Sequence, residues 1–123
     1  MRVVDSSVWI EWLSNTNLVP RLKGEIPVQS NCIVPTIVQL EVFKWLARQQ
    51  GMQAAEGFMA YTRLCEVVDL DTNIARFAAE ISAELKLSTA DAVIYATARH
   101  RDADLLTCDR HFETLKGVAY IEK

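Results

Sequence analysis

Four acidic residues that are widely spaced along the chain could together form a reactive site: Asp5, Glu41, Asp91 and Asp109. Each follows a predicted strand or lies in the first turns of a predicted helix. Carboxylates that share one site repel one another and raise one another's pKa, so they stay ionised together only around a cation. Because no Cys or His is predicted beside them, these oxygen ligands suit Mg²⁺ or Mn²⁺ better than Zn²⁺.

A site of this kind predicts metal-assisted hydrolysis of a phosphodiester. Ions of the Mg²⁺ class recruit phosphate oxygens of the substrate. One ion lowers the pKa of an attacking water, and two ions about 4 Å apart hold the attacking and leaving oxygens. We expect Asp5, Asp91 and Asp109 to be metal ligands and Glu41 to hold the ion or orient the water. The hydroxyls of the supporting residues, Ser6 and Thr107, are predicted to orient a carboxylate or a metal-bound water.

Each acid also has a simpler explanation when it is considered alone. Asp91 in the first turn of a helix complements the helix dipole, Asp109 is a suitable N-cap, and Glu41 can face solvent. Asp5 differs, because a carboxylate that follows an apolar strand is costly without a partner. The shared placement of all four acids favours the functional interpretation.

Alternating strands and helices must position these acids. The hydrophobic pattern predicts strands over residues 3–4, 31–35, 66–70, 104–107 and 118–121, and helices over residues 6–13, 18–23, 36–50, 54–64, 72–85, 88–98 and 109–115. Thr36 is the predicted N-cap of its helix. This order predicts one α/β domain over residues 1–123, with a parallel sheet covered by helices on both faces. Ligands bind such sheets outside the carboxyl ends of the strands, and all four acids are predicted at that edge.

Length and composition exclude several classes of protein. The chain has 123 residues, of which 50% are apolar and 24% charged, and its net charge is −3. That composition is globular rather than disordered, and no apolar run approaches the ~20 residues of a membrane span. The acidic balance gives no general attraction for nucleic acid, although an acidic metal site can coexist with a basic rim.

The cysteines and the N-terminus predict a cellular compartment. Cys32, Cys65 and Cys108 include no C-x-x-C pair, and we expect three buried thiols in a reducing compartment. The opening Met-Arg-Val-Val-Asp contains no apolar signal segment. We therefore expect a cytoplasmic protein.

The segments around the four acids resemble those of a known family. They are DSSVWIEWL from Asp5, PTIVQLEV from Pro35, STADAVIYATA from Ser88 and LTCDRHFETL from Leu106. In this order they look like the PIN domain and, more narrowly, the VapC-type ribonuclease toxins of bacterial type II toxin–antitoxin modules. The resemblance covers nearly the whole chain.

The resemblance implies a three-layer α/β/α fold with a central five-stranded parallel sheet. It also implies endoribonuclease activity that depends on Mg²⁺ or Mn²⁺, with transfer RNA or a ribosomal RNA loop as substrate. The family's acidic quartet matches Asp5, Glu41, Asp91 and Asp109, and Thr107 matches the hydroxyl residue before the last acid. Family members are usually homodimers that a VapB-type antitoxin silences. Because the last motif is the most variable, Asp104 remains an alternative to Asp109.

Basic and aromatic residues provide candidate contacts for partners. Arg99 and Arg101 at one helix end, and Arg110 beside Asp109, are candidate RNA contacts, although the first two can simply complement the helix C-terminus. His111 is interpreted as a surface residue. A further set, the tryptophans, is predicted to anchor an antitoxin helix or a dimer face: Trp9, Trp12 and Trp45.

Two competing functions remain. A phosphoacceptor receiver domain also gathers acids at the carboxyl ends of parallel strands, with Asp69 or Asp71 as the acceptor. That fold requires a Lys on a late strand, and residues 104–109 contain none. A nuclease-like fold kept only for binding is the other alternative, but all four acids are present, so nothing in the sequence supports loss of activity.

Overall fold

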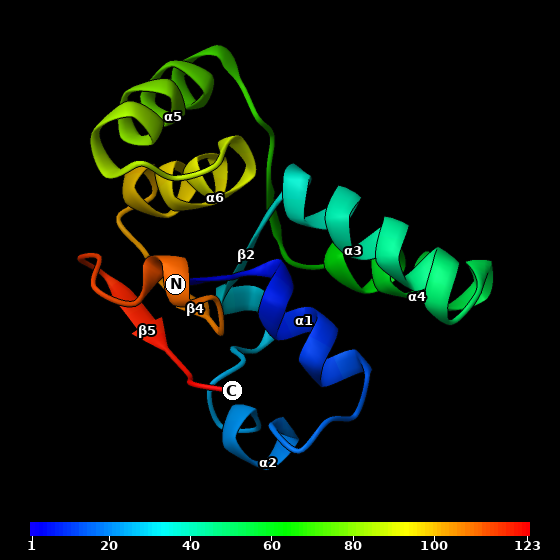
Figure 1. Ribbon diagram of the computed structural model, residues 1–123. Coiled ribbons are helices and arrows are strands. Elements are labelled where there is room, and N and C mark those ends of the chain that lie inside the picture. The colour runs from blue at the N-terminus through cyan, green and yellow to red at the C-terminus, as the bar shows by residue number, and fades with distance from the viewer.

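A five-stranded sheet, parallel throughout, forms the centre of the molecule in a computed structural model that describes residues 1–123 (Figure 1). Its strands are β1 (Arg2–Val4), β2 (Cys32–Pro35), β3 (Glu66–Val68), β4 (Asp104–Thr107) and β5 (Val118–Tyr120), in the spatial order β3-β2-β1-β4-β5. In register, Val4 pairs with Leu106, and Val3 pairs with both Ile33 and Leu105. The predicted parallel sheet is confirmed.

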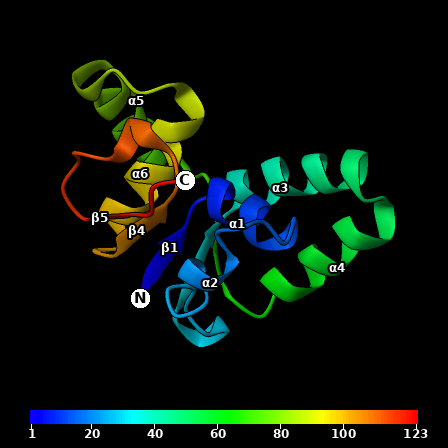
Figure 2. The ribbon, with the colours of Figure 1, turned by 60° about the horizontal axis from the view of Figure 1, so that its bottom comes forward.

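Six α-helices cover the sheet: α1 (Ser6–Leu13), α2 (Val19–Leu22), α3 (Thr36–Gln49), α4 (Met52–Thr62), α5 (Thr72–Leu85) and α6 (Thr89–His100). Figure 2 shows α1 to α4 on one side of the strands and α5 with α6 on the other. The three-layer α/β/α architecture is therefore confirmed. None of the helices is both long enough and apolar enough to cross a membrane.

The sheet and α6 pack closely because their facing residues are apolar and small. Val3, Val4, Leu105 and Leu106 are fully buried at the centre of the sheet. In α6 every residue from Ala92 to Ala98 is buried, since the helix lies between the sheet and α5. Burying apolar area in this way stabilises the fold by roughly 25 cal/mol per Å².

Some local predictions were wrong. Thr36 was the predicted cap of α3, but Pro35 occupies the N-cap position and Thr36 is the first helical residue. The Thr36 hydroxyl instead accepts a hydrogen bond from the Leu70 backbone at 3.3 Å. The segment from Asp109 to Leu115 forms only a short 3₁₀ turn, Arg110–Phe112. Cys65 is half-buried rather than buried.

The connections of the chain place a topological switch point between β1 and β4. The chain moves outward from β1 to β2 and β3, then returns to the other side of β1 at β4. Helices that follow the two directions lie on opposite faces, so they diverge where the direction reverses. The carboxyl ends of β1 and β4 therefore lie at the switch point, which is where such sheets bind ligands.

Candidate active site

Asp5 lies at the carboxyl end of β1, at this switch point. It follows β1 directly, occupies the N-cap position of α1, and is 2% exposed. The hydroxyls of Ser7 and Thr107 donate to its Oδ2 at 2.6 and 2.8 Å. Because both hydrogen bonds reach the same oxygen, Oδ1 is left for another ligand. Burial raises the pKa of Asp5, these two hydrogen bonds lower it, and the charges of Asp91 and Asp109 raise it.

Two hydroxyl residues hold the ends of β1 and β4 together, and sequence reasoning named only one of them. Thr107 is fully buried, and its Oγ1 also accepts from the Asp109 backbone N–H at 2.9 Å. Ser7 accepts from the Cys108 backbone N–H at 3.0 Å. Ser6, the other hydroxyl residue predicted to orient a carboxylate or a metal-bound water, lies against Glu41, where its hydrogen bond lowers the pKa of that carboxyl. The adjacent serines offered no sequence signal that distinguished their directions.

Glu41 reaches the same place from α3. Burial raises its pKa most, and the charges of Asp5 and Asp91 raise it further. Its Oε1 is buried and has no hydrogen-bond partner. An unsatisfied buried carboxylate oxygen is costly, so this atom is placed for a ligand that the protein itself does not provide.

Asp91 and Asp109 complete the group. The Ser88 hydroxyl caps α6 by accepting from the Asp91 backbone N–H at 3.3 Å, and Asp91 lies in the first helical turn. Asp109 caps the following 3₁₀ turn by accepting from the His111 backbone N–H at 2.9 Å. Burial and the charge of Asp109 raise the pKa of Asp91. Asp91, in the first helical turn, and Asp109, at an N-cap, therefore occupy the positions that their simpler explanations require, and they also lie near Asp5.

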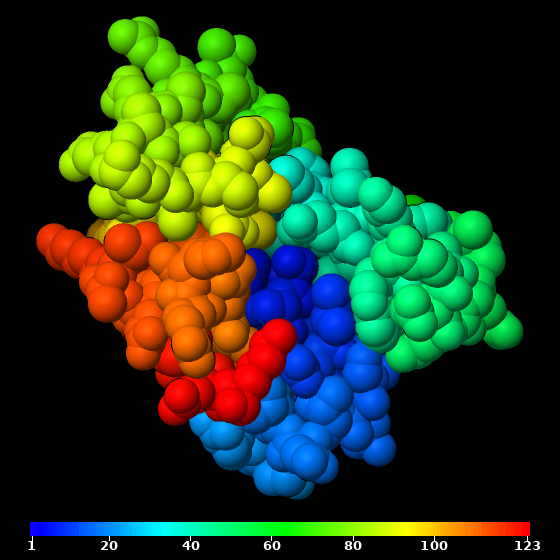
Figure 3. Space-filling model, in the orientation of Figure 1, coloured from blue at the N-terminus to red at the C-terminus, as the bar shows by residue number.

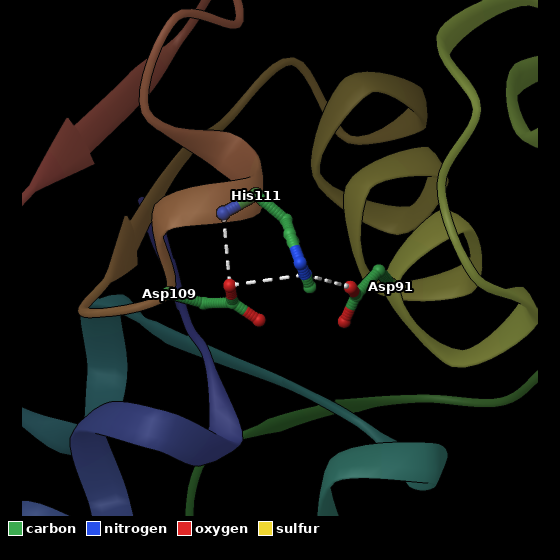
Figure 4. Close-up of side chains that lie close together, drawn as sticks. All are labelled: Asp91, Asp109 and His111. Atoms are coloured by element: carbon green, nitrogen blue, oxygen red, sulfur yellow. Dashed lines mark hydrogen bonds and ion pairs between the residues drawn. The ribbon is translucent and has the colours of Figure 1, made fainter.

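His111 is the residue of this site that the sequence interpretation missed. Its side chain is 74% exposed, in agreement with a surface position, yet Nδ1 lies 3.4 Å from Asp91 Oδ2 and 3.3 Å from Asp109 Oδ1. Figure 4 shows the imidazole between the two carboxylates. In the sequence, the only indication of this contact is that His111 follows Asp109 by two residues, a spacing at which a tight turn can bring the two side chains together.

The donor set fits a divalent cation. The four acids come from four separate segments, and His111 is the only basic side chain that pairs with any of them. Burial and mutual repulsion raise the pKa values of Asp5, Glu41 and Asp91, and Glu41 Oε1 has no partner. Asp91, Asp109 and His111 offer ligand atoms within 4.8 Å of one another. A cation would neutralise this charge and fill the missing contacts.

Other predicted residues lie elsewhere. Asp104, the alternative fourth acid, is at the start of β4 and binds Arg2 at 2.9 and 3.0 Å, at the opposite edge of the sheet. Arg101 follows the C-terminal end of α6 and pairs with Glu66 at 3.2 Å. Arg99 donates to the Lys116 carbonyl at 3.0 Å. Arg99 and Arg101 are about two and three helical turns from Asp91, respectively, whereas Arg110 is adjacent to Asp109.

Comparison with known families assigns the fold. A family model described as the PIN domain matches residues 2–118. The chain belongs to the PIN-domain family. No curated protein sequence matches this PIN domain.

Solved structures share the fold of this PIN domain along its whole length. A chain of a toxin–antitoxin complex from Klebsiella pneumoniae superposes with a TM-score of 0.84 at 22% identity, over 100% of both chains. VapC20 of Mycobacterium tuberculosis, a toxin that cleaves the sarcin–ricin loop, gives 0.81 at 19% identity, again over 100% of both. A DNA-bound VapBC from Salmonella typhimurium gives 0.75 at 20% identity, over 98% of this chain and 96% of the other.

Proposed function

We propose that this PIN domain, with residues 1–123 as one nuclease unit, is a metal-dependent endoribonuclease and the toxin of a type II toxin–antitoxin module. One observation carries the proposal: Glu41 Oε1 is buried without a partner among Asp5, Asp91 and Asp109. Such an arrangement is unfavourable for the protein alone and favourable around Mg²⁺ or Mn²⁺. The similarity to structures of toxins and toxin–antitoxin complexes supports the biological role.

Each side chain of the site would have its own role in phosphodiester hydrolysis. Asp5, Asp91 and Asp109 would hold the ion, and Glu41 would hold it or orient the attacking water. Thr107 keeps Asp5 Oδ2 occupied, so Oδ1 faces the ligand. When bound, the ion would lower the pKa of the attacking water and stabilise the charge that develops on the phosphate.

The RNA would approach over the rim that carries Arg110. A cavity of about 390 Å³ borders Asp109 and is lined by Ser7, Cys108, Asp109, Arg110, Tyr120, Glu122 and Lys123. Figure 3 shows the last residues of the chain, in red, against the blue residues of the first helix. Here Lys123 pairs with Glu11 at 3.6 Å. Arg110, which has no carboxylate partner of this kind, supplies positive charge for a phosphate backbone.

A separate apolar cavity suits a VapB-type antitoxin. It has a volume of about 520 Å³, and its walls include Trp9, Trp12, Phe58 and Tyr61, with Lys23 as the one charged residue. Trp9 is 3% exposed, and its Nε1 has no hydrogen-bond partner. An antitoxin segment would fit this cavity if its apolar side chain filled the space, a hydrogen-bond acceptor contacted Trp9 Nε1, and an acidic residue paired with Lys23. Trp45, predicted as a third anchor, does not line it. We propose that the complex forms in the cytoplasm between an antitoxin and a toxin homodimer.

The decisive experiment is cleavage of total RNA by the purified protein, followed by sequencing of the new RNA ends. We expect discrete cuts with Mg²⁺ or Mn²⁺ and none with EDTA. Asp91→Asn should abolish cleavage and retain the fold, while Asp69→Asn at an exposed acid outside the site should cleave normally. If RNA stayed intact with the wild-type protein and either ion, the proposed endoribonuclease activity would be refuted. Cleavage that survived Asp91→Asn would also refute the proposed enzyme.

A further inference from the structure

Two of the three cysteines lie opposite each other on neighbouring strands. Cys32 is the first residue of β2, and Cys65 immediately precedes β3. These strands pair in parallel with Ile33 opposite Glu66, so the preceding position brings Cys32 opposite Cys65. Neighbouring strands lie about 4.8 Å apart, and a disulfide requires a Cα separation of roughly 4.4–6.8 Å. The fold therefore places the two thiols at a separation that one covalent bond can span.

The two thiols contact each other but differ in exposure. Burial is the main reason that the pKa of Cys32 is raised to about 12, and it also raises the pKa of Cys65. A hydrogen bond between the thiols adds to the rise for Cys32 and opposes it for Cys65. Cys32 is 1% exposed, whereas Cys65 is half-buried. Cys65 is therefore the thiol that a small oxidant reaches first, and Cys32 is positioned to react with the oxidised Cys65.

We propose that Cys32 and Cys65 form a reversible oxidation site, at which a hydroperoxide converts the two thiols into a disulfide between β2 and the start of β3. The Cys65 thiolate attacks one peroxide oxygen, the O–O bond breaks, and the other oxygen leaves and takes up a proton as an alcohol or water. Cys65 is then a sulfenic acid. The Cys32 thiolate attacks the sulfenic sulfur, the S–S bond forms, and hydroxide leaves and takes up a proton as water. The two protons come from the two thiols, and the two electrons that the sulfurs lose reduce the peroxide.

The position of the pair explains why the disulfide would be reducible and what it would change. Opposed Cβ atoms on neighbouring strands lie about as far apart as the strands, ~4.8 Å, whereas disulfides favour ~3.8 Å. Such a deviation makes the bond easier to reduce. In the reduced protein the Cys65 thiol donates to the Tyr61 carbonyl at 3.8 Å, and Tyr61 lines the apolar cavity. Oxidation removes this hydrogen bond, so the site connects the redox state of the chain with the wall of the cavity.

The test is oxidation of the purified protein by hydrogen peroxide at about pH 8.5, where thiolate is more abundant than at neutral pH. Alkylation of the free thiols, digestion with trypsin and mass spectrometry follow. Trypsin cleaves after Lys44 and Arg63, so Cys32 and Cys65 fall in separate peptides. We expect these two peptides to be linked, two of the three free thiols to be lost, and dithiothreitol to restore both.

Two variants separate the steps of the reaction. Cys32→Ala should stop the oxidation at a Cys65 sulfenic acid, which dimedone captures. Cys108→Ala, the matched control at the remaining cysteine, should form the linked pair as the wild type does. Three free thiols after peroxide treatment would overturn the inference, as would a pair that includes Cys108, a bond between two protein molecules, or thiols that dithiothreitol does not restore. Because no step uses RNA, a metal or an antitoxin, failure here would remain distinguishable from failure of the proposed function.

Discussion

The Thr107 hydroxyl donates to Asp5 Oδ2 at 2.8 Å across 102 positions of the sequence. This hydrogen bond joins the carboxyl ends of the neighbouring strands β1 and β4. Thr107 also accepts from the Asp109 backbone N–H, so one buried hydroxyl orients two of the four acids. A residue that contacts no substrate in the proposed reaction therefore determines the geometry of the site.

Replacing Thr107 with Val tests this link without changing the side-chain volume greatly. The variant loses a hydrogen bond to a buried carboxylate, which we expect to lower the free energy of unfolding by about 1–3 kcal/mol. RNA cleavage should slow because Asp5 is no longer fixed. Urea denaturation and cleavage rates measure the two effects. Thr97→Val is the matched control, since buried Thr97 donates only to the Val93 carbonyl within α6. Cleavage equally affected by both substitutions would contradict the positioning role.

The fourth acid of the quartet can be assigned by comparing two amide substitutions. Asn at position 109 still caps the turn but lacks the charge, so Asp109→Asn should lower cleavage at least roughly 100-fold, beyond the range typical of residues that only support ligands. Asp104→Asn should leave cleavage unchanged and cost at most about 1 kcal/mol of stability, because its pair with Arg2 is partly exposed. The opposite pattern in cleavage assays would place Asp104 in the site.

The metal-free protein should lose stability as the pH rises. The pKa values of Asp5 and Glu41 are raised from their ordinary 3.8 and 4.5, chiefly by burial. The folded protein therefore holds more protons than the unfolded chain above about pH 4, and the free energy of unfolding falls as the pH passes through the raised values. Urea denaturation in EDTA across this range should show the fall.

Two comparisons isolate the cause of this pH dependence. Asp5→Asn removes one of the titrating groups and should reduce the slope, whereas Asp69→Asn should not. Saturating Mg²⁺ at neutral pH should restore stability by roughly 2.7 kcal/mol at 100 times its Kd. A slope that is the same in Asp5→Asn and the wild type would show that the carboxylates of the site do not cause it.

The sequence was sufficient to predict the sheet and the convergence of the acids, because both follow from the order of the elements. Asp5 and Asp109 each follow a short apolar strand, and parallel strands end at one edge. The contacts between individual side chains could not be predicted from the sequence. Ser6 and Ser7 are neighbours of the same type, and only the direction of α1 decides that Ser7 reaches Asp5.

His111 and Arg101 illustrate the same limit at the surface. A histidine beside an arginine has the sequence signature of an exposed position, and His111 is indeed exposed. Its contact with Asp91 depends on how the turn after β4 meets the start of α6, which no local pattern encodes. From the sequence, Arg101 could contact RNA or complement the helix C-terminus; α6 extends away from the acids and places it beside Glu66.

Arg110 should contribute to RNA binding rather than to the chemical step. Its side chain is exposed, borders the cavity beside Asp109, and has a raised pKa because of its hydrogen bond with Tyr120. Arg110→Ala should raise KM with little change in kcat and should reduce the salt dependence of RNA binding by about one phosphate contact. Arg76→Ala, on the exposed face of α5, is the control. Equal KM values for the two variants would exclude Arg110 from the RNA path.

The apolar cavity predicts how strongly an antitoxin depends on Trp12. Truncating a central aromatic anchor costs about 2 kcal/mol or more, so Trp12→Ala should weaken antitoxin binding at least roughly 30-fold. Lys23→Glu should also weaken it, because this substitution reverses the single charge of the cavity. Titration calorimetry with the proposed VapB-type antitoxin would measure both. Leu64→Ala is the matched control, since Leu64 is 71% exposed and lies outside the cavity. Were Trp12→Ala and Leu64→Ala to bind alike, the antitoxin would have to dock on another surface.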